Sequence, residues 1–223
     1  MKIKFIPLAA TAVFGLATAS QAATVVINAA APTVNNADIA STTSTATAGS
    51  STTTTAIGQT FTTLANVGGY QLNAVTVQVN GTALTARTFN VRVGEVNNVN
   101  ATLTQYNSST TESGTLAANT AAANSWITLT LDTPIMLAAS TGYGFDLSMV
   151  SGSNTTWLGN SVSVYAGGVR FADTTASTNT GLVRDSSGNR ELAFHLDIVA
   201  VPEPSTALLG GLGLLALLRR RRA

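Results

Sequence analysis

Apolar and polar residues alternate with a period of two along much of the middle of the chain. Residues 75–79, 89–93, 127–131 and 143–149 each place their larger apolar side chains at every second position. No stretch between the two ends repeats apolar residues at helical spacing over several turns. A period of two is typical of strands, and one-sided alternation is typical of antiparallel sheets with one packed and one wet face. The pattern therefore predicts an all-β body.

The same alternation assigns individual polar side chains to the wet face. Residues 192–198 form the last predicted strand, and its register turns the leucines, the phenylalanine and the isoleucine inward. His195 and Asp197 then point outward. In residues 143–149 the outward positions include Asp146 and Ser148.

At least six such strands, separated by loops rich in Gly, Asn and Ser, predict an antiparallel two-sheet sandwich in jelly-roll form. Asn80-Gly81 is a strong hairpin signal between two of them. We expect this β-sandwich ectodomain over residues 57–200. Residues 23–56 before it comprise a short strand and a Ser/Thr-rich low-complexity segment. Within it, residues 41–55 are either an O-glycosylated spacer or a long loop with a polar edge strand.

The C-terminal 23 residues have three parts with separate physical properties. The first is a proline motif that resists helix formation and stays extended, as the cleft of a processing enzyme requires. The second is apolar and only 12 residues long (207–218), about 18 Å as a helix against a hydrocarbon core of about 30 Å. This short hydrophobic helix suits a transient membrane insertion better than a permanent transmembrane helix. The third part is a basic cluster that stays on the cytoplasmic side of a membrane. The motif consists of Val201, Pro202, Glu203 and Pro204. The basic cluster consists of Arg219, Arg220, Arg221 and Arg222.

This tail resembles the PEP-CTERM sorting signal of Gram-negative bacteria, whose Pro-Glu-Pro is matched by Pro202, Glu203 and Pro204. The resemblance covers residues 201–223. It implies that the protein passes through an inner-membrane intermediate and is then cut free by a membrane-embedded exosortase. The destination it implies is the cell surface or the extracellular matrix. An ordinary membrane anchor that is never cut is the alternative.

A second resemblance covers residues 58–198. It rests on the order of Gly-Gln-Thr-Phe at residues 58–61, Trp-Ile-Thr-Leu at residues 126–129 and Tyr-Gly-Phe at residues 143–145. This order is similar to the jelly-roll domains of many exported PEP-CTERM and surface-anchored proteins, which are relatives of galactose-binding-like sandwiches. The resemblance implies the fold and does not specify a ligand.

The N-terminus has the parts of a secretory signal peptide, residues 1–22. Two early lysines precede an apolar stretch at residues 5–19, and Ser-Gln-Ala at residues 20–22 supplies small side chains before a cut. We expect signal peptidase to cleave between Ala22 and Ala23, and we expect the chain to be exported.

Charge changes the list of partners. Without its two ends the chain keeps five arginines and nine acidic residues, a formal charge of −4, and it has no lysine there. An acidic body offers little to a phosphate backbone, so no nucleic-acid partner is expected. Cysteine is absent, so the exported domain must rely on its core rather than on disulfides.

Catalytic residues are scarce. His195 is the only histidine, which excludes His-rich zinc sites and His-Glu-x-x-His chemistry. A Ser-His-Asp triad would need His195 with Asp197, and no Gly-x-Ser-x-Gly elbow accompanies them. We therefore expect no enzyme activity, no catalytic residue and no cofactor.

Three aromatic residues are candidates for glycan binding, because sugar-binding sandwiches stack aromatic rings on pyranoses. They are Trp157, Tyr165 and Tyr106, which lie in or beside polar loops, although Trp157 and Tyr165 are also explained as core residues or hairpin flanks. Asp173 and Asp185 with nearby carbonyls are candidates for a structural calcium, although no EF-hand spacing supports it.

Two hypotheses follow from these observations. The first is a non-catalytic surface or matrix protein associated with exopolysaccharide. The second is a carbohydrate-binding module that acts on matrix glycans.

Overall fold

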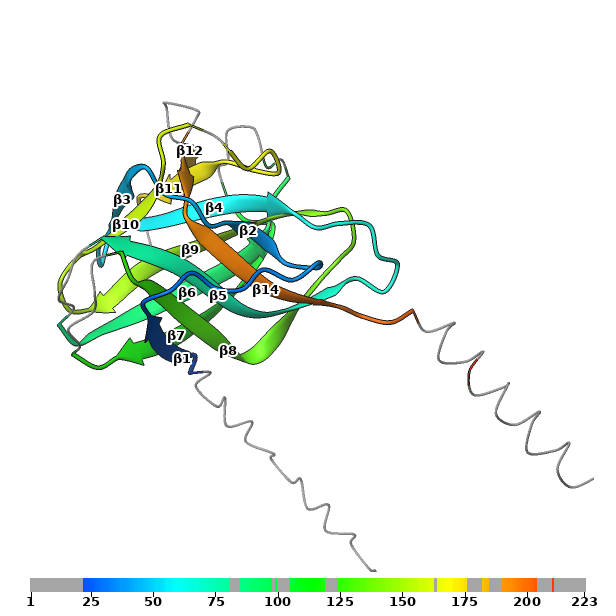
Figure 1. Cartoon of the computed structure of the whole chain (residues 1–223), viewed down its shortest axis with the longest axis horizontal. Coiled ribbons are helices and arrows are strands. Elements are labelled where there is room, and N and C mark those ends of the chain that lie inside the picture. Colours follow the sequence, from blue (N-terminus) through cyan, green and yellow to red (C-terminus); the bar gives the residue numbers. More distant parts are fainter. Residues whose placement is uncertain are drawn as a thin grey trace, which may run out of the picture.

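The computed structural model describes residues 22–80, 85–97, 99, 105–118, 124–162, 164–175, 182–184, 190–203 and 210. These residues form fourteen strands arranged as two antiparallel sheets packed face to face (Figure 1). This confirms the predicted all-β, two-sheet sandwich. In this described part of the chain, no helix is long and apolar enough to cross a bilayer.

The larger sheet has eight strands, ordered β1-β8-β5-β10-β13, with β14 pairing with both β5 and β2, and β3 pairing with β10. β5 is its centre, because β8 lies along one side and β14 and β10 share the other. The strands are β1 (Thr24–Asn28), β2 (Ile39–Ser41), β3 (Ala46–Ser51), β5 (Tyr70–Asn80), β8 (Trp126–Leu137), β10 (Thr155–Asn160), β13 (Glu191–Leu192) and β14 (Phe194–Ala200).

The smaller sheet has six strands in the order β12-β11-β4-β9-β6-β7. They are β4 (Ala56–Thr62), β6 (Arg87–Glu95), β7 (Ser108–Leu116), β9 (Gly142–Ser151), β11 (Arg170–Asp173) and β12 (Leu182–Arg184).

The core lies between the two sheets and follows the period-two pattern of the sequence. Phe61, Phe89, Phe145, Trp157 and Phe194 are all fully buried. Their rings contact one another across the sandwich, with Phe89 and Trp157 at 5.8 Å and Phe145 and Phe194 at 5.5 Å between centroids. Ring pairs at such distances add to the free energy gained by burying apolar area.

Buried polar side chains tie the two sheets together at their edges. Glu112 of β7 accepts hydrogen bonds from the backbone N–H groups of Asp132 at 2.8 Å and Thr133 at 3.3 Å, both in β8. At β13, which ends the strand order of the larger sheet, the N–H of Leu192 donates at 3.1 Å to the side-chain oxygen of Gln59 in β4. A buried polar group that lost such a partner would cost about 1–3 kcal/mol.

The N-terminal and Ser/Thr-rich residues belong to the larger sheet. β1 pairs with β8, β2 pairs with β14, and β3 pairs with β10. Ser51, within the Ser/Thr-rich residues 41–55, is fully buried. Its hydroxyl donates to the carbonyl oxygen of Leu147 in the other sheet at 2.5 Å.

The prediction of one wet face on each sheet is wrong at three positions. Asp146 is 2% exposed, Ser148 is 3% exposed and His195 is 5% exposed, although all three lie on the outer faces of their sheets. The outer face of the smaller sheet is covered by a second apolar cluster formed by Val96, Tyr106, Phe171 and Leu182. The outer face of the larger sheet is crossed by residues 29–38. These covering segments are far in sequence from the strands they cover, so the alternation within a strand cannot predict them.

Candidate functional site

The sorting motif begins one residue after the last strand of the sandwich. β14 ends at Ala200, and the N–H of Val201 donates to the carbonyl oxygen of Gly69 at 3.0 Å. The side-chain amide of Asn66 donates to the carbonyl oxygen of Val201 at 3.1 Å. A Cβ on Gly68 would lie 2.1 Å from that oxygen, so only glycine permits this approach. We call this pair of hydrogen bonds the Val201 clamp.

Beyond the clamp the motif leaves the sandwich without a spacer. Pro202 is exposed and Glu203 is partly exposed. Pro204, the hydrophobic stretch apart from Gly210, and the cluster Arg219, Arg220, Arg221 and Arg222 lie outside the described residues. The predicted signal-peptide cut lies at the other end of the described chain. Ala22 is exposed, whereas Ala23 is 6% exposed and donates its N–H to the carbonyl oxygen of Ser113 at 2.9 Å.

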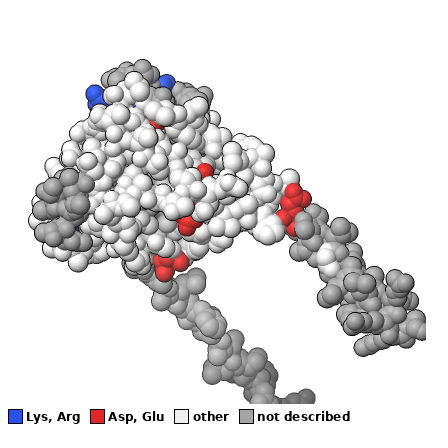
Figure 2. Space-filling view, in the orientation of Figure 1, with Lys and Arg blue, Asp and Glu red and all other residues white. Residues whose placement is uncertain are grey.

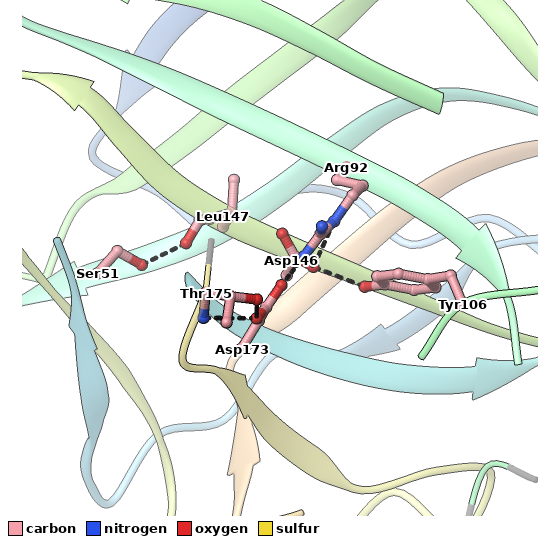
Figure 3. A network of polar contacts seen from close by, with 7 residues as sticks. All are labelled: Ser51, Arg92, Tyr106, Asp146, Leu147, Asp173 and Thr175. Atoms are coloured by element: carbon pink, nitrogen blue, oxygen red, sulfur yellow. Dashed lines mark hydrogen bonds and ion pairs between the residues drawn. The ribbon is translucent and has the colours of Figure 1, made fainter. Parts of the chain in front are cut away.

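A buried ionic network lies on the outer side of the smaller sheet (Figure 3). Arg92 of β6 donates to Asp146 of β9 from Nε at 3.0 Å and from Nη2 at 2.6 Å, and Nη2 also donates to Asp173 of β11. The hydroxyl of Tyr106 donates to the same Asp146 oxygen at 2.7 Å, and its ring centroid is 4.9 Å from Cζ of Arg92. The other oxygen of Asp173 accepts from the N–H and the hydroxyl of Thr175, both at 2.8 Å.

The guanidinium of Arg92 therefore forms ion pairs with two carboxylates in a buried site. Burial raises the pKa of Asp146 to about 6, although Arg92 and Tyr106 oppose the shift, and the neighbouring charge of Asp173 adds to it. Burial also raises the pKa of the Tyr106 hydroxyl well above its usual value, and the charge of Asp146 adds to this. Burial by itself would lower the pKa of Arg92, but the two carboxylates outweigh burial and raise it.

A perturbed carboxyl can mark a catalytic site, but this one lacks access. Arg92, Tyr106, Asp146 and Asp173 are each at most 5% exposed. Their contacts join β6, β9 and β11, so the network holds three strands and the cluster above them in register. We assign it a structural role.

The candidate glycan-binding rings do not form a sugar platform, which corrects that hypothesis. Trp157 is fully buried in the core, and its Nε1 donates to the hydroxyl of Ser51 at 2.7 Å. Tyr106 is 3% exposed within the ionic network. Tyr165 is partly exposed, but its ring packs edge-on against Phe194 at 5.5 Å, and its hydroxyl accepts from the N–H of Thr62 at 3.4 Å. Trp157 and Tyr106 therefore have no exposed face for a pyranose, whereas Tyr165 keeps partial exposure beside Phe194.

The calcium hypothesis also needs correction at Asp173. This carboxylate is fully buried and uses its oxygens for Arg92 and Thr175. Asp185 lies outside the described residues. Across the parts of the chain that are described, no three His, Cys, Asp or Glu side chains gather as a possible metal site.

A groove that the sequence did not predict lies on the outer face of the larger sheet. We call residues 29–38 the strap. It crosses from β1 to β2 (Figure 1). Two hollows that share Pro32 in their linings lie beside it. The hollows have volumes of about 250 Å³ and about 310 Å³, and both are lined by Pro32, Thr76 and Thr128. The larger one also includes His195 and Asp197.

His195 is fixed by the end of the strap. Its Nε2 lies 2.9 Å from Oδ2 of Asp38, whose side chain is 1% exposed. Asp38 also accepts from the N–H groups of Asn35 at 2.6 Å and Ile198 at 3.2 Å. Burial would raise the pKa of Asp38, but these hydrogen bonds and His195 outweigh burial and lower it. His195 was the sole candidate catalytic base, and its Nε2 is used to hold the strap to β14.

Glycines within strands were the one sequence signal for the covered outer face. Gly58, Gly94 and Gly144 lie inside β4, β6 and β9. A Cβ on Gly58 would come within 2.4 Å of the Phe171 ring, and one on Gly94 within 2.6 Å of the Tyr106 ring. Glycine inside a strand often marks a close approach of another group, and here that group is an aromatic ring.

The sandwich has only low structural similarity to the known proteins that match it. No curated protein matches the chain. One similar structure contains the cysteine protease and lectin-like domains of Cwp84, a surface layer associated protein of Clostridium difficile, with 11% identity, TM-score 0.41, and coverage of 66% of this chain and 32% of that one. Another is the clostridial cysteine protease Cwp84 after propeptide cleavage, with 11% identity, TM-score 0.42, and coverage of 74% and 38%. This chain thus spans about a third of those chains, and TM-scores below 0.5 support no functional inference.

The C-terminus gives a definite match. Residues 200–222 match the PEP-CTERM protein-sorting motif. This agrees with the tripartite tail of the sequence and with the abrupt exit of the chain from the fold after Val201. PEP-CTERM proteins are exported, processed by an exosortase and sorted to the cell surface. The chain therefore carries the PEP-CTERM protein-sorting motif at the end of an all-β two-sheet domain.

Proposed function

We propose that this chain is an exported, non-catalytic component of the cell surface or extracellular matrix that associates with exopolysaccharide. Signal peptidase removes residues 1–22, the apolar tail holds the chain at the inner membrane, and an exosortase then cuts it free. The sandwich is, in this proposal, a jelly roll. That topology is supported by β4, β5 and β6, and again β8, β9, β10 and β11, which pass alternately between the sheets.

The Val201 clamp is the observation that carries the proposal. It places the first residue of the motif on the rigid end of β14 and leaves Pro202 exposed. A processing enzyme can therefore take the motif from a folded domain. Residues held by the clamp cannot extend into a protease cleft while the sandwich stays folded, so the proposed cut lies C-terminal to Val201.

The non-catalytic part of the proposal is supported by the state of the ionisable groups. His195 is paired with Asp38, and the perturbed Asp146 is buried within an ionic network. Within the described residues, no serine hydroxyl is recorded in contact with His195.

Fractionation of the native host, with and without its exosortase, tests the sorting proposal. With the enzyme, intact mass should show a protein that begins at Ala23, ends at or beyond Val201 and lacks the arginine cluster. Without the enzyme, the same chain should stay membrane-bound and end at Ala223. A chain that ends at Ala223 in both hosts, or before Val201 in either, contradicts the proposal.

A carbohydrate-binding role is the second candidate. The specific observation that favours it is the hydroxyl-lined groove beside the strap, rather than the aromatic residues expected from the sequence.

A further inference from the structure

We propose that the groove beside the strap binds a neutral, hydroxyl-rich glycan. This inference rests on the second candidate function and gives it a site. The larger hollow, about 310 Å³, falls at the lower end of the range of small-ligand sites. Its floor is sheet and is set by regular backbone pairing, and one wall is the strap, which Asp38 ties to His195 and Ile198 of β14.

The floor is a row of hydroxyl groups across neighbouring strands. Thr76 of β5 faces Thr128 of β8, with their hydroxyl oxygens 3.0 Å apart, and Thr130 follows on the same face. Each hydroxyl has one donor and two acceptor positions, so the shared contact leaves further positions for a ligand. Hydroxyl groups spaced by a sheet can donate to and accept from the hydroxyls of a sugar.

Two polar groups lie at one side of this row. Asp38 occupies Nε2 of His195, so Nδ1 is the ring nitrogen left for a ligand hydroxyl. Among the described residues no partner of Nδ1 is recorded, although His195 is only 5% exposed. Asp197 lies two residues further along β14, half-buried on the same face, and no described residue is recorded as bonding its carboxylate. The Asp197 carboxylate can accept from ligand O–H groups, and Nδ1 of His195 can form a hydrogen bond with a ligand hydroxyl, which both donates and accepts.

The charge of the groove selects among ligands. Among the described residues, no arginine or lysine lines either hollow, and few charged side chains are visible on this face of the molecule (Figure 2). A phosphate or a uronate would meet the Asp197 carboxylate without a compensating cation. The ring of Pro32 and the methyl group of Ala74 offer apolar contact to the C–H groups of a sugar. A neutral glycan fits these surroundings.

Affinity electrophoresis of the exported protein recovered from its host provides the test. The gels contain soluble dextran, galactomannan or galactan as neutral probes, and alginate as the anionic comparison. The test variants are Thr128→Val, which keeps the side-chain shape, and Asp197→Ala. Each removes at least one hydrogen bond, and a loss of about 1.4 kcal/mol corresponds to about a tenfold higher Kd.

The control is Thr115→Val. Thr115 and Thr88 form the same hydroxyl pair, 3.0 Å apart, on the smaller sheet. We expect at least one neutral probe to retard the wild type and Thr115→Val equally, and to bind the two groove variants about tenfold more weakly, with unchanged thermal midpoints. Equal binding by all variants, binding to alginate alone, or no retardation by any neutral probe overturns the inference. Fractionation reports sorting separately, so failure of the glycan site and failure of sorting are distinguishable.

Discussion

The side-chain amide of Asn66 donates to the carbonyl oxygen of Val201, so a turn more than a hundred residues upstream holds the first residue of the sorting motif. The same amide reaches the carbonyl oxygen of Gly69, which accepts from the N–H of Val201. One asparagine thus organises both halves of the clamp.

Asn66→Ala should release the clamp without unfolding the sandwich. The exit of the chain then moves upstream toward Ala200, and we expect mature protein whose C-terminus is heterogeneous and includes ends before Val201. Intact mass spectrometry of the released protein measures this. Asn36→Ala, an exposed asparagine on the strap, is the control and should give the wild-type end. An unchanged C-terminus in Asn66→Ala would show that the clamp does not limit processing.

Arg92→Met should be among the most destabilising substitutions of a charged residue. It leaves two buried carboxylates without their cation, and breaking a buried pair in this way costs about 3–5 kcal/mol. Urea unfolding of the mature protein measures the change in the free energy of unfolding. Arg190→Met is the matched control, because Arg190 is exposed, and it should change stability by less than about 0.5 kcal/mol. Equal stability of the two variants would exclude the proposed role of the network.

Asp146→Asn should change how stability depends on pH. The pKa of Asp146 is about 6 in the folded protein against an ordinary 3.8. Between these values the folded state holds a proton that the unfolded chain has released, so this group lowers the free energy of unfolding as pH rises through that window. Asp146→Asn removes this contribution, and unfolding midpoints measured from pH 4 to 7 should be flatter than in the wild type. Parallel curves for the two proteins would contradict the raised pKa.

Asp38→Asn should also change how stability depends on pH, but in the opposite direction and at lower pH than Asp146→Asn. The pKa of Asp38 is lowered in the folded protein. Its stabilising contribution is therefore present above the pKa of an unfolded aspartate and is lost as pH falls through the folded value. The variant should be less stable than the wild type at pH 7 and should approach it at low pH. If the variant stays less stable than the wild type by the same amount below both pKa values, the loss comes from a poor steric fit of the amide and not from the lost charge.

Trp157→Ala should unfold or strongly destabilise the protein. The ring is fully buried against Phe89, and removing such a side chain costs about 3–5 kcal/mol. Thermal unfolding followed by circular dichroism provides the measurement, with the exposed Val164→Ala as control. Near-wild-type stability together with lost glycan binding would restore the sequence-based assignment of this residue.

The amino-acid sequence alone was sufficient for the properties that depend on neighbouring residues. Period-two alternation identified the core residues of β5, β6, β8, β9 and β14, because a strand turns alternate side chains to opposite faces whatever its partners are. The sorting motif was equally readable, because Pro202, Glu203 and the tail beyond them act as a contiguous peptide. The match at residues 200–222 confirms that prediction.

Only the tertiary structure decided what covers the outer faces of the sheets. The burial of Asp146 and His195 depends on Asp173, Tyr106 and Asp38, which lie 27 to 157 residues away in the chain. Local periodicity contains no information about contacts at such separations, because loop closure rather than strand geometry brings the groups together. For the same reason, the sequence alone could not predict that Trp157 is buried in the core or that a groove lies beside the strap.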